Sequence, residues 1–276
     1  MQHNSVRYIV LFAGAVCVLC SFFVSTAAVF LKDRQQANEL LDKQEKVLEV
    51  SGLLEELVEE GLLEEGKRPS KDQVSKSFDE RIVMRLIDLD TDAAAADDVG
   101  IDPATYDQLA ASKDPDMSAV VPSNFARVRR VPRYAVVYEV FKDAENKELD
   151  LRVLPIEGMG LWGTMYGFLA LDSDGNTIRG LTFYKTKETP GLGKEVEYSS
   201  WQSKWPGRKV FDANWEPVIE VIKGVAGPPS EAPHQVDGLS GATLTSRGVT
   251  NLLRFWFGEE GFGPYLAQLR AEGSGT

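Results

Sequence analysis

Four hydroxyl side chains lie within seven positions near the carboxyl end of this chain: Ser240, Thr243, Thr245 and Ser246. Glycines at 238 and 241 stand among them and allow the backbone to bend and to approach a bulky group closely. Directly afterwards, apolar residues recur at the three- and four-residue spacing of an amphipathic helix. We therefore expect the hydroxyls in a turn or in the first turn of that helix, where unpaired N–H groups stabilise an anion.

This hydroxyl-rich segment has two interpretations. Ser and Thr are ordinary helix caps and glycines form turns, so the segment can be a simple capping structure. Alternatively, it can be a phosphate site, or a hydroxyl in it can carry a phosphate ester. Residue types and spacing alone do not choose between the two.

A second glycine-rich segment, Gly158-Met159-Gly160-Leu161-Trp162-Gly163, has the letters of the dinucleotide motif G-x-G-x-x-G. That motif must open a helix. Here a β-rich run, residues 164–171, follows instead, and Asp172 to Gly175 then turns the chain into another one, so we expect a hairpin. The glycines can let a flat ligand lie against the backbone while Trp162 offers a stacking contact, although a tryptophan is more often a core residue.

The third segment, Lys185 to Lys194, contains Glu188-Thr189-Pro190-Gly191-Leu192-Gly193 and follows a predicted strand. Proline and two glycines predict an irregular loop. Loops on rigid strands commonly carry ligand-binding groups. The plain alternative is a simple strand-to-helix connection.

The remaining elements predict an α+β domain with antiparallel hairpins and helices against the sheet. We expect strands at 81–88, 134–141, 149–156, 164–171, 178–184 and 218–225, and helices at 197–204, after the hydroxyl segment and at 265–269. Residues 70–80 are polar and predict a linker or loop, and residues 90–116, rich in Asp and Ala, predict a loop or irregular helix. We expect the tail, residues 271–276, to be disordered.

Residues 8–31 carry no charge and, as a helix, span about 36 Å, which is enough to cross a bilayer. We prefer an uncleaved membrane anchor to a signal peptide cleaved near Thr26-Ala27-Ala28. Cationic residues flank both ends, so charge gives no orientation. Cys17 and Cys20 lie inside the run with C-x-x-C spacing, but no other Cys completes a metal site, and buried or lipid-facing thiols are ordinary apolar groups.

Residues 32–66 combine leucines with many glutamates and predict a helical stalk leading out of the membrane, followed by a short helix. The formal net charge of the chain is −12, which argues against nucleic acid as a partner. The predicted organisation is a short segment (1–7), a transmembrane helix (8–31), a stalk and irregular region packing on the domain (32–130), a folded domain (131–270) and a tail (271–276).

The segment Asp237-Gly238-Leu239-Ser240-Gly241-Ala242-Thr243-Leu244-Thr245-Ser246 resembles the flavinylation motif of FMN-binding domains in respiratory flavoproteins. Together with residues 158–171 and 188–193, and with the membrane-proximal residues 40–48, it is similar to the C-type subunit of the sodium-translocating NADH:quinone oxidoreductases. The resemblance covers nearly the whole chain and is weaker at 89–130. Residues 188–193 and the motif are also shared with the G-type subunit of Rnf complexes.

The resemblance implies that FMN is attached through its phosphate to Thr243, with Thr245 the nearest rival hydroxyl. It implies that the flavin contacts Trp162, Thr189, Leu192 and Gly193, that Glu188 bonds the flavin or orients its loop, and that Ser240, Gly241 and Ala242 lie at the phosphate. Asp237 would serve recognition by the attaching enzyme.

The same resemblance implies an electron-carrier subunit without an NADH or quinone site of its own, working with the other subunits of a membrane complex that moves sodium. It also implies a flavin transferase that uses FAD and a divalent metal, with this chain as its substrate. The domain is expected outside the cytoplasmic membrane, with lipid around the anchor. An Rnf-type carrier and a cofactor-free membrane-anchored binding module are the alternatives.

Overall fold

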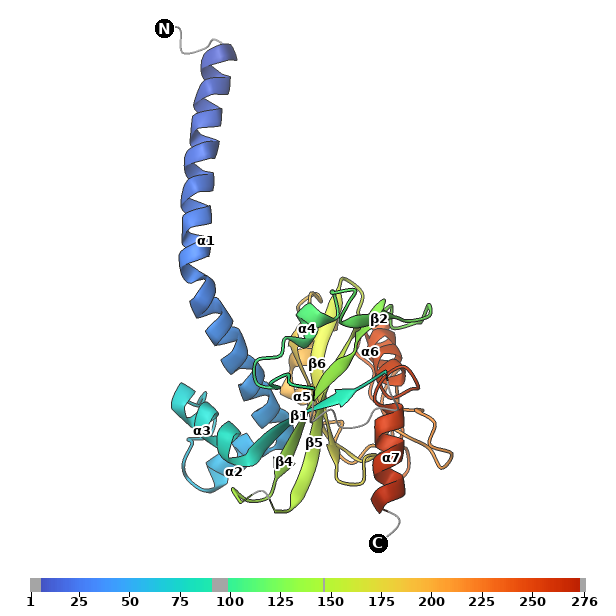
Figure 1. The fold of residues 1–276 in the computed structure, drawn as a ribbon. Helices are drawn as coiled ribbons and strands as arrows, with labels where there is room; N and C mark the ends of the chain where they lie inside the picture. Colours follow the sequence, from blue (N-terminus) through green and yellow to red (C-terminus); the bar gives the residue numbers. More distant parts are fainter. Residues whose placement is uncertain (1–5, 91–98, 146, 274–276) are drawn as a thin grey trace. The chain divides into compact units, whose positions relative to one another are not determined.

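The computed structural model describes residues 6–90, 99–145 and 147–273, and divides the chain into two compact units, Met1–Lys43 and Gln44–Thr276. The backbone is an α+β fold (Figure 1). The first helix, α1 (Val6–Ser51), contributes to both units. The expected fold class is therefore confirmed.

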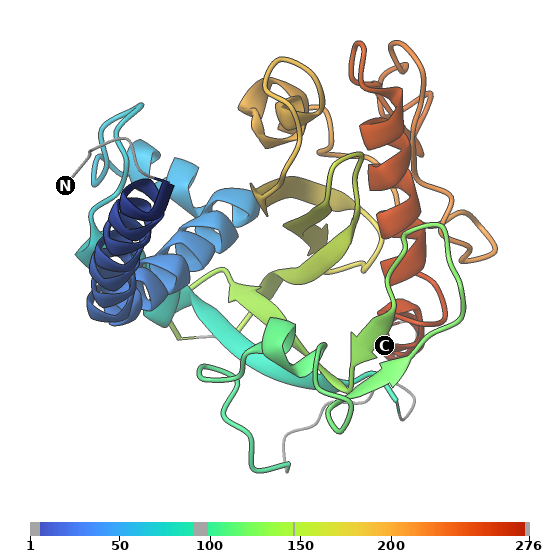
Figure 2. The same ribbon diagram turned by 90° about the horizontal axis from the view of Figure 1, so that it is seen from above.

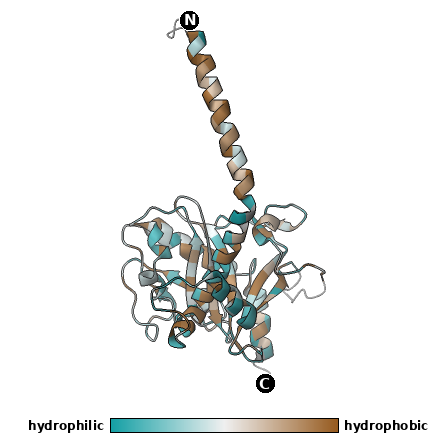
Figure 3. Ribbon diagram, turned by 90° about the vertical axis from the view of Figure 1, so that its left-hand side faces the viewer, coloured by the Kyte–Doolittle hydropathy of each residue, from teal (hydrophilic) through white to brown (hydrophobic). Residues whose placement is uncertain are grey.

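Within α1, residues Val6–Lys32 form the one segment in the described part of the chain that is long and apolar enough to cross a membrane. Figure 3 shows this stretch coloured mostly hydrophobic. The helix predicted for residues 8–31 is thus present. Cys17 and Cys20 are free thiols on its exposed surface, and the described residues contain no cluster of three or more metal-ligating side chains.

An antiparallel sheet of five strands in the order β1-β4-β5-β6-β7 forms the centre of the second unit. The strands are β1 (Ile82–Asp88), β4 (Tyr134–Phe141), β5 (Leu149–Met159), β6 (Thr164–Asp172) and β7 (Ile178–Lys185). The two predicted hairpins are confirmed, and β5 runs three residues beyond the expected end, so Gly158 and Met159 belong to the strand rather than to the turn.

The sheet buries both faces, with α6 (Thr243–Trp256) on one side and the end of α1 together with α3 (Lys71–Arg81) on the other (Figure 2). Toward α6 the main core contains Leu154, Leu169 and Trp256, all fully buried. On the opposite face, Phe78, Tyr138 and Phe168 form successive edge-on aromatic contacts with ring centroids 6.0 and 5.7 Å apart. Burial on both faces explains why the strand sequences show nearly continuous apolar runs.

The end of α1 is part of the folded unit. Val47 and Leu48 are fully buried, and α1 stops at Gly52, whose φ of 83° begins α2 (Leu53–Glu59). The carbonyl of Val50 lies so close to β7 that a Cβ on Gly180 would be 2.6 Å from it. The second compact unit thus begins at Gln44 and includes the end of α1.

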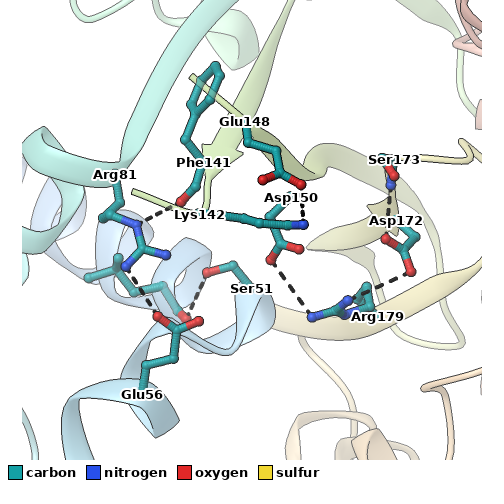
Figure 4. Close-up of polar contacts among 11 residues, drawn as sticks. Ser51, Glu56, Arg81, Phe141, Lys142, Glu148, Asp150, Asp172, Ser173 and Arg179 are labelled. Carbon is teal, nitrogen blue, oxygen red and sulfur yellow. Dashed lines mark hydrogen bonds and ion pairs between the residues drawn. The ribbon is translucent and has the colours of Figure 1, made fainter. Parts of the chain in front are cut away.

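The predicted linker at 70–80 is wrong, because these residues form α3 (Lys71–Arg81). Ser70 and Gln73 make a reciprocal capping box at its start. Val74 and Phe78, four residues apart on one face of the helix, are buried. The polar composition concealed a recognisable capping signal. At the other end, Arg81 donates to the Phe141 carbonyl at 2.7 Å and contacts Glu56 at 3.2 Å, which joins α2 and α3 to the sheet (Figure 4).

Several peripheral elements also differ from expectation. Of the strand predicted at 218–225, only two residues form a strand, β8 (Glu220–Val221). It pairs in parallel with an equally short strand, β9 (Gln235–Val236). The helix predicted at 197–204 is a 3₁₀ turn (Gly193–Glu197) followed by α5 (Ser199–Gln202). The final helix, α7 (Gly263–Gly273), is longer than predicted and includes half of the expected tail, while 274–276 lie outside the described residues.

The described part of the irregular region contains three short elements: α4 (Gln108–Ala111), β2 (Ser118–Val120) and β3 (Arg130–Pro132). Residues 91–98 of the Asp- and Ala-rich stretch lie outside the described residues. Because β1 and the end of α1 precede this region and belong to the sheet and its cover, the irregular region is an insertion within the folded unit.

Candidate functional site

The hydroxyl-rich segment forms a turn that leads into α6, with Thr243 as the first helical residue. Gly241 adopts a φ of 70°, a left-handed conformation that favours glycine. Ala242 occupies the N-cap, where no side chain caps the helix. The capping interpretation therefore fails, since no hydroxyl of the segment caps the first turn of α6, and the positive end of the helix is left without a side-chain partner.

The two threonines of the segment face in different directions. Residues two apart on a helix are separated by about 200° around its axis. Thr243 is exposed, whereas Thr245 is fully buried. Ser246 is also buried, and its hydroxyl accepts a hydrogen bond from the N–H of Leu239 at 3.1 Å, which closes the turn on itself.

Glu188 connects all three glycine-containing segments. Its side chain is buried, and Oε1 accepts hydrogen bonds from the backbone N–H groups of Leu161 and Trp162 at 2.9 and 3.0 Å. Its other oxygen, Oε2, accepts the hydroxyl proton of Thr245 at 2.5 Å. Both carboxylate oxygens are therefore used within the chain, one on the turn between β5 and β6 and the other on α6.

Two glycines make room for this carboxylate. A Cβ on Gly160 would lie 2.5 Å from Oε1 of Glu188. A Cβ on Gly193 would lie 2.4 Å from Oε2 and 2.5 Å from the Thr245 hydroxyl. These glycines are thus required by the close approach of Glu188, whatever else lies near them.

Leu192 brings the proline-glycine loop against the hydroxyl-rich turn. Its Cδ2 atom would be 3.0 Å from a Cβ on Gly241. The loop itself is folded by the Thr189 carbonyl, which accepts the N–H groups of Leu192 and Lys194, each at 3.1 Å. Leu192 and Trp162 remain 43% and 64% exposed, so both leave apolar surface open to a ligand.

The helix α6 itself sits unusually close to β5. A Cβ on Gly248 would lie 2.6 Å from the Met159 carbonyl, so only glycine permits the approach. At the far end of the helix, the indole N–H of Trp256 donates to the Glu157 carbonyl at 2.6 Å. The close approach at Gly248 and the bond of Trp256 together hold α6 along the end of β5.

These predicted residues thus meet at one end of α6, although they come from three separate segments, and Glu188 and Thr245 alone are 57 residues apart. The residue types of this site suit FMN. An exposed hydroxyl at the uncapped start of a helix can carry a phosphate ester, and the exposed side chains of Leu192 and Trp162 offer apolar surface for a flat ring.

Comparison with known proteins agrees with this geometry. The chain is 44% identical over 272 residues to the C-type subunit of the Na(+)-translocating NADH-quinone reductase of Pseudomonas aeruginosa, an alignment that covers 98% of this chain and 97% of that protein.

The chain belongs to the NqrC family, the C-type subunits of the Na(+)-translocating NADH-quinone reductases.

Other comparisons extend the NqrC assignment over the whole chain. The corresponding protein of Yersinia pestis is 42% identical over 271 residues, covering 98% of this chain and 95% of that protein. The crystal structure of Shewanella oneidensis NqrC, at 31% identity, superposes with a TM-score of 0.72 and covers 85% of this chain and 99% of that one. The FMN-binding domain family matches residues 160–258, which include every predicted site residue. Both alternatives, the Rnf-type carrier and the cofactor-free module, are set aside by these matches.

In this NqrC family member, Asp237 is turned away from the Glu188 group. Its Oδ2 pairs with Lys204 at 2.5 Å and its Oδ1 accepts the N–H of Ala226 at 2.8 Å. Burial acts to raise the pKa of Asp237, but Lys204 and the Ala226 N–H outweigh it and hold the pKa below its ordinary value. The carboxylate is therefore ionised and occupied in holding the turn, and its predicted part in enzyme recognition stays a prediction.

Sequence reasoning missed three residues of the site. Ser246 was counted only as one more hydroxyl, although it closes the turn. Gly160 was expected only to make room for a ligand and Gly248 was given no role, yet a Cβ at either would lie within 2.6 Å of a protein atom. A signal for Gly248 existed, since a glycine inside an amphipathic helix costs stability and usually has a packing reason.

Proposed function

We propose that this chain is the FMN-carrying electron-transfer subunit of a sodium-translocating NADH-quinone reductase, with the flavin phosphate esterified to Thr243. The carrying observation is the contrast between the two threonines of the motif. Thr243 is exposed at the uncapped start of α6, whereas Thr245 is fully buried and bonded to Glu188. Of these two hydroxyls, only the first is accessible to a modifying enzyme.

In the attachment reaction the Oγ atom of Thr243 forms a bond to the phosphorus of the FMN half of FAD. The pyrophosphate P–O bond breaks, AMP leaves with the electron pair, and the threonine proton passes to a base of the transferase. A separate flavin transferase and a divalent metal belong to this proposal, and the chain acts as their substrate. The exposed turn at Ser240 and Gly241 gives that enzyme access.

Once attached, FMN supplies the electron-transfer chemistry. The chain contributes position: the first turn of α6 offers N–H groups and a favourable dipole to the phosphate, with Ser240, Gly241 and Ala242 beside it. Thr189, Leu192 and Trp162 would contact the ribityl chain and ring, and Gly193 would lie beneath them. Glu188 acts through the protein rather than by bonding the flavin, because its side chain is buried and already accepts three hydrogen bonds within the chain.

The proposed setting is a single-pass protein in the cytoplasmic membrane. Val6–Lys32 has the length and composition of an anchor, and its surface would contact lipid and the other subunits of the complex. We place the flavin-carrying unit on the extracytoplasmic side, in keeping with the resemblance of the sequence, and assign no nucleic acid partner because the net charge is −12.

Intact-mass analysis tests the attachment site. Wild-type protein co-expressed with the transferase should gain the mass of FMN less one water, on the peptide that contains Thr243. Thr243→Val should lose the whole gain and keep its melting temperature, since Thr243 is exposed. Ser200→Ala, which removes an exposed hydroxyl outside the site, serves as the control and should be fully modified. Covalent flavin retained in Thr243→Val would refute the assignment.

A further inference from the structure

Glu188 has a bonding pattern that joins two pieces of the flavin site which have no other described hydrogen bond between them. One oxygen holds the Leu161–Trp162 turn through two backbone N–H groups, and the other holds the hydroxyl of Thr245. Charge-assisted hydrogen bonds of this kind are about twice as strong as neutral ones. The carboxylate is buried, so little water competes for it.

We propose that Glu188 is a positioning residue that fixes the Trp162 turn against the first turn of α6, and so sets where Trp162 stands relative to the flavin on Thr243. This inference rests on the proposed attachment site. The turn that carries Trp162 runs from Gly160 to Gly163 and needs support from outside. Within it, one backbone hydrogen bond, from the N–H of Gly160 to the carbonyl of Gly163 at 2.8 Å, closes the turn.

The turn has little packing of its own. Leu161 and Trp162 are 42% and 64% exposed, so their side chains contribute little to holding the backbone in place. An aromatic side chain on a fixed backbone is preorganised for a ligand, whereas the same side chain on a mobile turn loses entropy on binding. Glu188 supplies the fixed backbone by accepting both N–H groups.

The carboxylate in turn is held in one place. Gly160 lies against one carboxylate oxygen and Gly193 against the other, so closely that a Cβ atom added to either glycine would clash with Glu188. Thr245 lies on the inward side of α6, and Gly248, one turn further along, keeps that helix against β5. The position of α6 is therefore transmitted through Thr245 and Glu188 to the turn of Trp162.

Hydrogen–deuterium exchange of the full-length protein in detergent tests the first half of this proposal without any flavin. The background is Thr243→Val, which removes the attachment hydroxyl. In it, Glu188→Ala should raise exchange at residues 160–163 by about tenfold or more, and Glu188→Gln, which keeps a neutral acceptor, by about threefold. Thr245→Val leaves the turn bonds intact and should raise exchange there by less than about threefold.

Two matched controls separate positioning from general loss of stability. Glu195→Gln removes a nearby charge on the same stretch of chain. Thr250→Val removes a buried hydroxyl of α6 that makes no hydrogen bond with Glu188. This hydroxyl accepts a hydrogen bond from the N–H of Val221 at 2.9 Å. Both should leave exchange at 160–163 unchanged. A rise spread evenly over the whole chain in the Glu188 variants, or no rise at 160–163, overturns the proposal.

Fluorescence anisotropy of the attached flavin tests the second half. With Thr243 intact, Glu188→Ala and Thr245→Val should both lower the anisotropy and relieve quenching of the flavin, and Thr245→Ser, which keeps the hydroxyl, should restore wild-type values. Unchanged anisotropy in both variants would reject the positioning role while leaving the attachment site intact. Failure of Thr243 to carry flavin would instead reject the proposed function, and the exchange result would stand.

Discussion

Gly193 and Gly191 are two positions apart in one loop, and the structure gives them different reasons to be glycine. A Cβ on Gly193 would lie 2.4 Å from Oε2 of Glu188 and 2.5 Å from the hydroxyl of Thr245. Gly191 has open space around it but adopts a φ of 74°. Gly193→Ala therefore tests packing, and Gly191→Ala tests backbone strain.

The expected costs follow from those contacts. A methyl group at Gly193 must separate Glu188 from Thr245, and overpacking costs about 1–3 kcal/mol while a lost bond to a charged group costs about 1.5–3 kcal/mol. Lower entropy of the unfolded chain returns about 0.4–1 kcal/mol. We expect a net loss of about 2–5 kcal/mol for Gly193→Ala. Gly191→Ala should lose about 1 kcal/mol or less, because left-handed strain of about 1–2 kcal/mol is offset by the same entropy return.

Thermal unfolding of the full-length protein in detergent measures this difference, since each kcal/mol shifts the melting temperature of a domain of this size by about 2–4 °C. Gly193→Ala should melt well below Gly191→Ala, and it alone should raise exchange at residues 160–163. Equal melting temperatures for the two variants would show that Glu188 and Thr245 rearrange freely, and would refute the rigid site described above.

Two further perturbations test the pH response and the extent of the folded unit. Burial raises the pKa of Glu157 to about 7 from an ordinary value of 4.5, and Lys113 opposes the rise. Between these two pH values the folded state keeps this carboxyl group protonated, whereas the unfolded state loses the proton. The free energy of unfolding therefore falls as the pH rises from about 4.5 to 7. Glu157→Gln should therefore be more stable than wild type at pH 8, by about 1–3 kcal/mol, and the two melting curves should converge near pH 4; an equal difference at both pH values would contradict the shifted pKa. Leu48→Ala should lower the free energy of unfolding by about 2–5 kcal/mol, because Leu48 is fully buried. Leu40→Ala should lower it little, because Leu40 is 52% exposed. Equally small effects of the two substitutions on the melting temperature would place the end of α1 outside the folded unit.

Local sequence was sufficient for those elements whose signals are short-range. The alternating and continuous apolar runs predicted four of the five sheet strands to within a residue or two at most ends, and hydrophobic length predicted the apolar helix. Resemblance in three motifs predicted the family. The α3 helix was missed although its capping box was readable at Ser70 and Gln73, because its polar composition was given more weight than its cap.

Tertiary structure alone decided which members of the motifs touch. Glu188 bonds Thr245 across 57 residues and the Trp162 turn across 26, distances over which no helical or strand period carries information. It also decided that Thr245 is buried while Thr243 is exposed, which depends on how α6 is rotated against β5. The sequence thus determined the chemistry available and the elements that bear it. Their meeting at one buried carboxylate was determined by packing of the helix on the sheet, because only that packing removes Thr245 from water and leaves Thr243 in it.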